Sequence, residues 1–177
     1  MPILLIAIVA MLVQQTIASA AKVGLPALFP ALAEELNFDA EYVLVYTWIY
    51  AVVGVVVMMG CGGAIRRWGA LRTSQAGCVL MAAGLSTAAI LANPWFVVPA
   101  LGLAAILNST GTMVATPASS QILARYAPPK WAPLVFSIKQ TGVPAGIAIA
   151  GIILAPLAVT YGWRAAALGL AGVCLVV

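Results

Sequence analysis

Residues 73–124 read TSQAGCVLMAAGLSTAAILANPWFVVPALGLAAILNSTGTMVATPASSQILA and contain no charged side chain. A stretch of this length is too long for one membrane helix, because about 20 apolar residues cross the hydrocarbon core. Asn93-Pro94 divides it, since proline disfavours helical backbone at the residue before it. The stretch therefore predicts two successive membrane-spanning helices, over residues 73–92 and 95–124.

The rest of the chain repeats this pattern. Of its 177 residues, 64% are hydrophobic and 7% are charged, against about 45–50% and about 25% in soluble domains. Apolar runs of this length without strict alternation favour helices over barrel strands. We therefore predict an all-α membrane protein with six transmembrane helices, at residues 3–33, 42–65, 73–92, 95–124, 131–160 and 165–177. The last run is too short to cross the bilayer, so we expect a truncated sixth helix.

The distribution of charge predicts the orientation. Short cytoplasmic loops carry an excess of lysine and arginine. Five basic residues follow the second and fourth spans, namely Arg66, Arg67, Arg72, Arg125 and Lys130. Only Arg164 follows the fifth span, and all four acidic residues lie in the loop after the first span, which we expect on the outer side. The pattern predicts a cytoplasmic N-terminus in the plasma (inner) membrane.

The reactive residue types exclude several functions. The chain has no histidine, its three cysteines lie in apolar runs, and no span contains an acidic residue. The residue sets needed for general acid–base catalysis or metal binding are therefore missing. The basic residues form no single surface stripe of the kind that binds nucleic acid. We expect a protein that is not an enzyme, with no catalytic residue, no metal, no cofactor and no nucleic-acid partner.

Two lysines lie inside predicted spans, Lys22 in the first and Lys139 in the fifth. A charge near the bilayer centre costs about 2.5–3.5 kcal/mol on insertion scales. An unpaired cation in a water-filled cavity would attract an anion such as a carboxylate. The alternatives are that each lysine extends its head group to the interface, or that it pairs with an acid elsewhere in the protein.

Helical spacing groups other polar residues into stripes. One face of the first span carries Gln15, Ser19 and Lys22, and one face of the fourth carries Asn108, Thr112, Thr116 and Ser119. One face of the second span carries Tyr42, Tyr46 and Tyr50. Packing between helices is the alternative to lining a cavity. The candidate substrate-binding residues are Gln15, Ser19, Lys22, Tyr46, Tyr50, Asn108, Thr112 and Lys139.

Glycines and prolines predict close packing and kinks. Gly142 and Gly146 are spaced four apart, which is typical of a small-residue face that lets two helices approach closely. Pro117 and Pro144 each leave one helical carbonyl without its backbone donor. We expect a kink in the fifth span beside Lys139.

Three segments resemble the major facilitator superfamily. Gly62-Gly63-Ala64-Ile65-Arg66-Arg67-Trp68-Gly69-Ala70-Leu71-Arg72 resembles its loop signature G-x-L-a-D-R-x-G-x-x-R. Gly62, Arg67, Gly69 and Arg72 match, whereas Arg66 replaces the aspartate that helps to hold the cytoplasmic gate closed in the family. Ser137-Ile138-Lys139-Gln140-Thr141-Gly142-Val143-Pro144 is similar to the fifth-helix segment of cyanate- and nitrate-type permeases, and Tyr161-Gly162-Trp163-Arg164 is similar to a G-W-R before the sixth helix.

The resemblance implies the N-terminal six-helix half of a twelve-helix carrier, whose partners are the lipid bilayer, a solute and the missing C-terminal half of the same chain. It also implies alternating access, with the first and fourth helices lining the cavity. The function expected is secondary active transport of a small solute, and the two lysines favour an anion or organic acid. A drug or metabolite exporter of the same fold and a non-transporting membrane assembly subunit are the alternatives.

Replacing Lys22 with glutamine tests the anion interpretation. Glutamine removes the charge from the predicted cavity while it keeps a polar side chain. We expect anion uptake to be abolished and the amount of protein in the membrane to stay normal. Unchanged uptake would contradict the assignment of Lys22 to the binding site.

Overall fold

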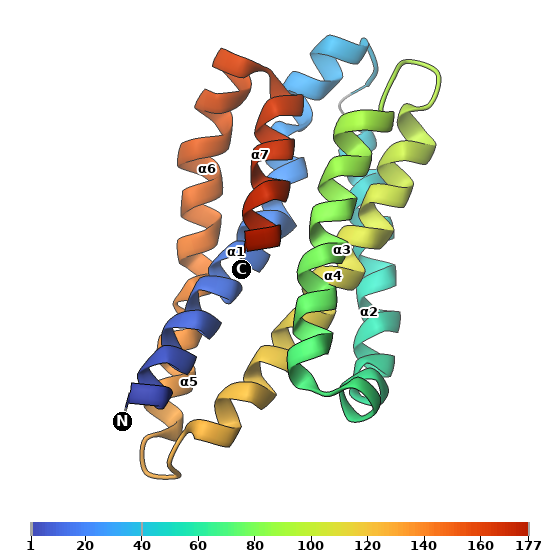
Figure 1. Ribbon diagram of the computed structural model, residues 1–177. Coiled ribbons are helices and arrows are strands. Elements are labelled where there is room, and N and C mark those ends of the chain that lie inside the picture. The colour runs from blue at the N-terminus through green and yellow to red at the C-terminus, as the bar shows by residue number, and fades with distance from the viewer. Residues whose placement is uncertain (1, 40, 177) are drawn as a thin grey trace.

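The computed structural model describes residues 2–39 and 41–176 as a bundle of helices joined by short connections (Figure 1). The helices are α1 (Pro2–Leu36), α2 (Tyr42–Trp68), α3 (Ala70–Leu91), α4 (Val97–Tyr126), α5 (Ala132–Gln140), α6 (Gly142–Tyr161) and α7 (Trp163–Val176). Since α5 and α6 together form one span, five spans are long and apolar enough to cross a membrane, and α7 is a shorter apolar helix. The predicted all-α class is confirmed; Val177, at the end of the predicted sixth span, lies outside the described residues.

The connections explain where the helices end. Between α3 and α4, Asn93 Oδ1 accepts the backbone N–H groups of Trp95 and Phe96, so the turn at Asn93-Pro94 is held by a side chain. Between α2 and α3 the helices run further than the sequence predicts, and Gly69 alone joins them. Its φ of 84° is a conformation that glycine adopts without steric cost. The segment expected as a loop is therefore a turn between two helices, with Arg67 in the last turn of α2 and Arg72 in the first turn of α3.

Successive spans run in opposite directions (Figure 1). The start of α1, the α2–α3 turn and the α4–α5 connection lie at one end of the bundle. The five basic residues of the predicted cytoplasmic loops therefore gather at the same end as the start of α1. Arg164 lies at the opposite end, together with the described acidic residues that follow α1.

A second glycine turn relates the two halves of the bundle. Gly162 joins α6 to α7 with φ 83° and ψ 153°, and Gly69 has φ 84° and ψ 155°. Each turn follows an aromatic residue, and each leads into the helix that closes a three-helix unit. The units α1–α3 and α4–α7 thus have corresponding parts and run in opposite directions, the arrangement of an inverted repeat.

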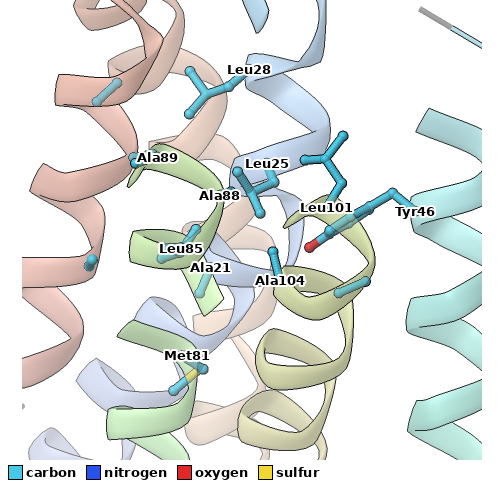
Figure 2. Packing of buried hydrophobic residues seen from close by; sticks show 14 of the residues in the cluster. Ala21, Leu25, Leu28, Tyr46, Met81, Leu85, Ala88, Ala89, Leu101 and Ala104 are labelled. Carbon is cyan, nitrogen blue, oxygen red and sulfur yellow. The ribbon is translucent and has the colours of Figure 1, made fainter. Parts of the chain in front are cut away.

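Small residues bring the helices into close contact. A Cβ added to Gly77 on α3 would lie 2.9 Å from the carbonyl oxygen of Gly111 on α4. A Cβ added to Gly146 on α6 would overlap the carbonyl oxygen of Thr16 on α1. Leucine and alanine side chains of α1, α3 and α4 fill the space between these contacts, as Figure 2 shows around Leu25 and Leu85. Such packing replaces the hydrophobic effect as the main cause of helix association in lipid.

Gly146→Ala should destabilise the bundle, because the new methyl group has no room beside the backbone of α1. Overpacking of this kind costs about 1–3 kcal/mol, so we expect a lower midpoint in thermal denaturation of the purified protein. Gly151→Ala is the matched control on the same helix, since nothing lies within 4 Å of its added Cβ. Equal stability of the two variants would contradict the close approach of α1 and α6.

Candidate functional site

Lys139 is a buried cation held by neutral oxygens. Its side chain on α5 is 1% exposed. Its Nζ donates hydrogen bonds to the carbonyl oxygen of Thr116 (3.1 Å) and to Ser120 Oγ (2.7 Å), both on α4. Within residues 2–39 and 41–176, no carboxylate pairs with it. The ammonium group therefore points into the bundle and does not extend along lipid to the interface.

The break between α5 and α6 lies beside Lys139. Thr141 interrupts the span, and its N–H donates to the carbonyl oxygens of Ser137 and Ile138. Pro144 has no N–H to donate to the carbonyl of Gln140, which agrees with the kink predicted from the sequence. The interruption separates the short helix that carries Lys139 from the glycine-lined helix that packs on α1.

On α4, the hydroxyl groups bond mostly to their own helix. Thr116 donates to the carbonyl oxygen of Thr112, and Ser119 and Ser120 donate to that of Thr116. The Thr116 carbonyl also accepts Lys139, so it is the point where the hydroxyls and the lysine meet. The hydroxyl groups of Thr116 and Ser119 therefore bond within α4 and do not line a cavity. Ser120 Oγ and the Thr116 carbonyl oxygen are the two groups that bind Lys139.

A second polar cluster joins α1, α2 and α4. Asn108 is fully buried, and its Nδ2 donates to the carbonyl oxygen of Ala21 (2.9 Å) and to Tyr46 Oη (3.1 Å). The hydroxyl groups of Tyr50 and Thr112 share a hydrogen bond. Figure 2 shows Tyr46 reaching from α2 toward α1 and α4. Four of the predicted site residues, Tyr46, Tyr50, Asn108 and Thr112, are thus in one cluster. Asn108 Oδ1 is a buried acceptor with no partner among the described residues.

The predicted stripe on α1 is divided. Gln15 and Ser19 are buried where α1 meets α6: a Cβ added to Gly142 would lie 3.1 Å from Gln15 Cβ, and one added to Gly146 would lie 2.8 Å from Ser19 Cβ. Lys22, further along the same face, is exposed. The glycines Gly142 and Gly146 of α6 lie against Gln15 and Ser19, and neither is near Lys22. Lys22 and Lys139 are therefore in different surroundings.

The residues that match the loop signature of the major facilitator superfamily lie near the surface. Gly62, Arg66, Arg67 and Arg72 are exposed near the α2–α3 turn. In the described part of the chain, none of these arginines forms an ion pair. This fits the replacement of the signature aspartate by Arg66.

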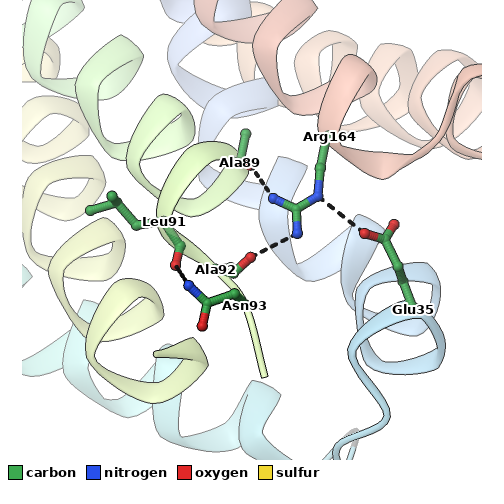
Figure 3. Close-up of polar contacts among 6 residues, drawn as sticks. All are labelled: Glu35, Ala89, Leu91, Ala92, Asn93 and Arg164. Atoms are coloured by element: carbon green, nitrogen blue, oxygen red, sulfur yellow. Dashed lines mark hydrogen bonds and ion pairs between the residues drawn. The ribbon is translucent and has the colours of Figure 1, made fainter. Parts of the chain in front are cut away.

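Arg164 has a structural role that the charge pattern did not predict. Its guanidinium donates to Glu35 Oε1 (3.1 Å) and to the carbonyl oxygens of Ala89 (2.5 Å) and Ala92 (2.7 Å) (Figure 3). It thereby satisfies carbonyl groups at the C-terminal end of α3 and connects α1, α3 and α7. The only sign in the sequence was the Gly-Trp-Arg segment before the last helix.

Gln14 is a second residue that the sequence analysis missed. Its Nε2 contacts Ser74 Oγ and Cys78 Sγ, so it fastens α1 to α3 inside the bundle. The adjacent residue, Gln15, was the one that the spacing singled out. Nothing in the spacing separates a glutamine that joins two helices from one that lines a cavity.

Five long apolar spans packed into an all-helical bundle define a multi-pass membrane protein. The chain matches the Major Facilitator Superfamily over residues 3–177 and belongs to this superfamily. Its members are secondary transporters and not enzymes. No curated protein and no solved structure matches the chain.

Ser120→Ala should remove one of the two described hydrogen bonds of Lys139, because it leaves the ammonium group with the Thr116 carbonyl as its one described partner. A hydrogen bond to a charged group contributes about 1.5–3 kcal/mol, and we expect a loss of this order in the free energy of unfolding. Ser119→Ala is the matched control, since Ser119 Oγ bonds only within α4. Losses of equal size in a denaturation series would contradict the role of Ser120.

Proposed function

We propose that this protein is a secondary active transporter of a small anion or organic acid, and that Lys139 provides the charge that binds it. One observation carries the proposal: the ammonium group is buried, and its partners in the described chain are two neutral oxygens. A buried charge is costly unless it is paired. An anionic solute is the simplest partner that compensates it during transport.

The hydrogen bonding of Lys139 leaves room for such a partner. An ammonium group has three N–H donors, and the described contacts use two of them. The third has no partner among the described residues, and we assign it to an oxygen of a carboxylate, nitrate or cyanate. The turn at Thr141 supports this role, because it lies between the helix that carries Lys139 and the helix that packs on α1 at Gly142 and Gly146.

The other candidates would complete the site from α1, α2 and α4. Lys22 is a second cation on α1, exposed on the described surface. The amide of Asn108 and the hydroxyls of Tyr46, Tyr50 and Thr112 supply neutral hydrogen-bonding groups on α2 and α4. Because α1 and α4 hold corresponding places in the two repeats, polar groups on both are suited to a site at the repeat interface.

We place this unit in a larger carrier. The proposed arrangement is the N-terminal six-helix half of a twelve-helix protein in the plasma (inner) membrane, with a cytoplasmic N-terminus. The solute crosses by alternating access between the halves. Gly69 and the exposed residues Gly62, Arg66, Arg67 and Arg72 would then form part of the cytoplasmic gate. Resemblance of residues 137–144 to the cyanate- and nitrate-type permeases favours small monovalent anions.

Uptake by proteoliposomes that contain the full-length protein tests the proposal. We expect uptake of at least one of nitrate, cyanate, formate and oxalate, and a drop of at least tenfold in Lys139→Gln, because the charge that binds the anion is lost. Lys130→Gln is the control: Lys130 lies outside the spans, with its ammonium over the ring of Trp131. Uptake of organic cations in place of anions, or full activity in Lys139→Gln protein of normal stability, would contradict the proposal.

A further inference from the structure

An apolar slot lies between α1, α6 and α7, three helices that pack against one another (Figure 1). Its volume is about 280 Å³, and Ala20, Ile153, Leu157 and Leu170 are among the residues that line it. Of the described residues in the lining, Thr16 alone is polar, and its hydroxyl donates to the carbonyl oxygen of Leu12 in its own helix. The slot therefore offers apolar contacts and no polar group that a water-soluble ligand would need.

A second hollow lies at one end of the slot, where α6 turns into α7. Its volume is about 460 Å³, and its lining includes Glu34 and Glu35 near the end of α1 and Trp163 at the start of α7. On α6, Leu157 lines the slot and the next residue, Ala158, lines the hollow. The slot and the hollow thus follow one another along a single groove between the same three helices.

The length of this groove matches one leaflet of a bilayer. Its lining on α6 runs from Val159 to Ile149, and its lining on α7 runs from Trp163 to Val173. Each of these stretches rises about 15 Å as a helix, and one leaflet accounts for about 15 Å of a hydrocarbon core that is about 30 Å thick. Because these helices lie in lipid, an acyl chain is the apolar molecule at hand to fill the slot.

The hollow contains a carboxylate without an ionic partner. Glu35 pairs with Arg164 (Figure 3), whereas Glu34 forms no ion pair with a described residue. A guanidinium has five N–H donors, and three of those of Arg164 have described partners. Arg164 lies 4.7 Å over the ring of Trp163, whose Nε1 is a buried donor with no partner among the described residues. A cation could therefore bind at Glu34 and a neighbouring anionic group at these donors.

We propose that the groove binds a phospholipid whose head group carries a primary amine, such as phosphatidylethanolamine. One acyl chain fills the slot, the ammonium group donates to Glu34, and the phosphate accepts from Arg164 and Trp163. A choline head group has no N–H to donate to the carboxylate, and a glycerol head group brings a net negative charge beside it. The inference is independent of the solute, because the lining comes from α1, α6 and α7 and does not include Lys139.

Two glycines of α7 test the slot. A Cβ added to Gly169 or to Gly172 would meet no atom within 4 Å, but only Gly169 is in the slot lining. We would label the full-length protein in detergent with phosphatidylethanolamine that carries a photoactivatable acyl chain. We expect cross-links at residues 149–157 and 166–173, a yield at least tenfold lower in Gly169→Leu, and a wild-type yield in the control Gly172→Leu. Equal yields in the two variants, or cross-links spread evenly over α2 and α6, would overturn the inference.

Competition by unlabelled lipids tests the head group. With matched acyl chains, we expect phosphatidylethanolamine to displace the labelled lipid at a concentration at least tenfold lower than phosphatidylcholine or phosphatidylglycerol. Glu34→Gln should remove the difference between the ethanolamine and choline lipids, because the carboxylate that binds the ammonium is lost. Glu41→Gln, on an acidic residue outside the lining of the hollow, should keep the difference. Equal displacement by the three lipids in wild-type protein, or an unchanged preference in Glu34→Gln, would contradict the assignment.

Discussion

The Lys139 ammonium group inside an apolar bundle is the constraint on which the proposed mechanism depends. Lipid offers no water to solvate it, so each of its protons needs an oxygen from the protein or from a solute. The described chain supplies two, the Thr116 carbonyl and Ser120 Oγ, both on α4. The short helix α5 is thus fastened to α4 by a charged group, whereas α6 is fastened to α1 by backbone contact at glycines.

This difference gives the two parts of the fifth span different properties. Glycine contacts on α6 are fixed by shape, and a single methyl group would disturb them. α5 is held by the hydrogen bonds of Lys139 to α4 and by apolar packing of Val135 against α1 and α4. Thr141 lies between the two parts.

The fold class was predictable from the sequence, because apolar runs of sufficient length have one structural solution in lipid when they do not alternate. The proline effects at Asn93-Pro94 and Pro144 are also local, so the breaks beside them could be expected. The turns at Gly69 and Gly162 could not be located to one residue, since a glycine shows only that a positive φ is allowed.

The candidate site was only partly predictable. Periodicity identifies a face of a helix, but the neighbour that covers that face is a tertiary property. This is why Gln15 and Lys22 share a stripe and yet differ in exposure. The partners of Arg164 are carbonyl groups and Glu35, distant in sequence, and no spacing rule reports such contacts.

The most direct test of the central claim is an experimental structure of the full-length protein soaked with bromide, whose anomalous signal locates an anion. We predict a bromide peak in contact with Lys139 Nζ, between α4 and α5. A carboxylate side chain paired with Lys139 Nζ and no bromide beside it would contradict the account, because the charge would then be compensated within the protein.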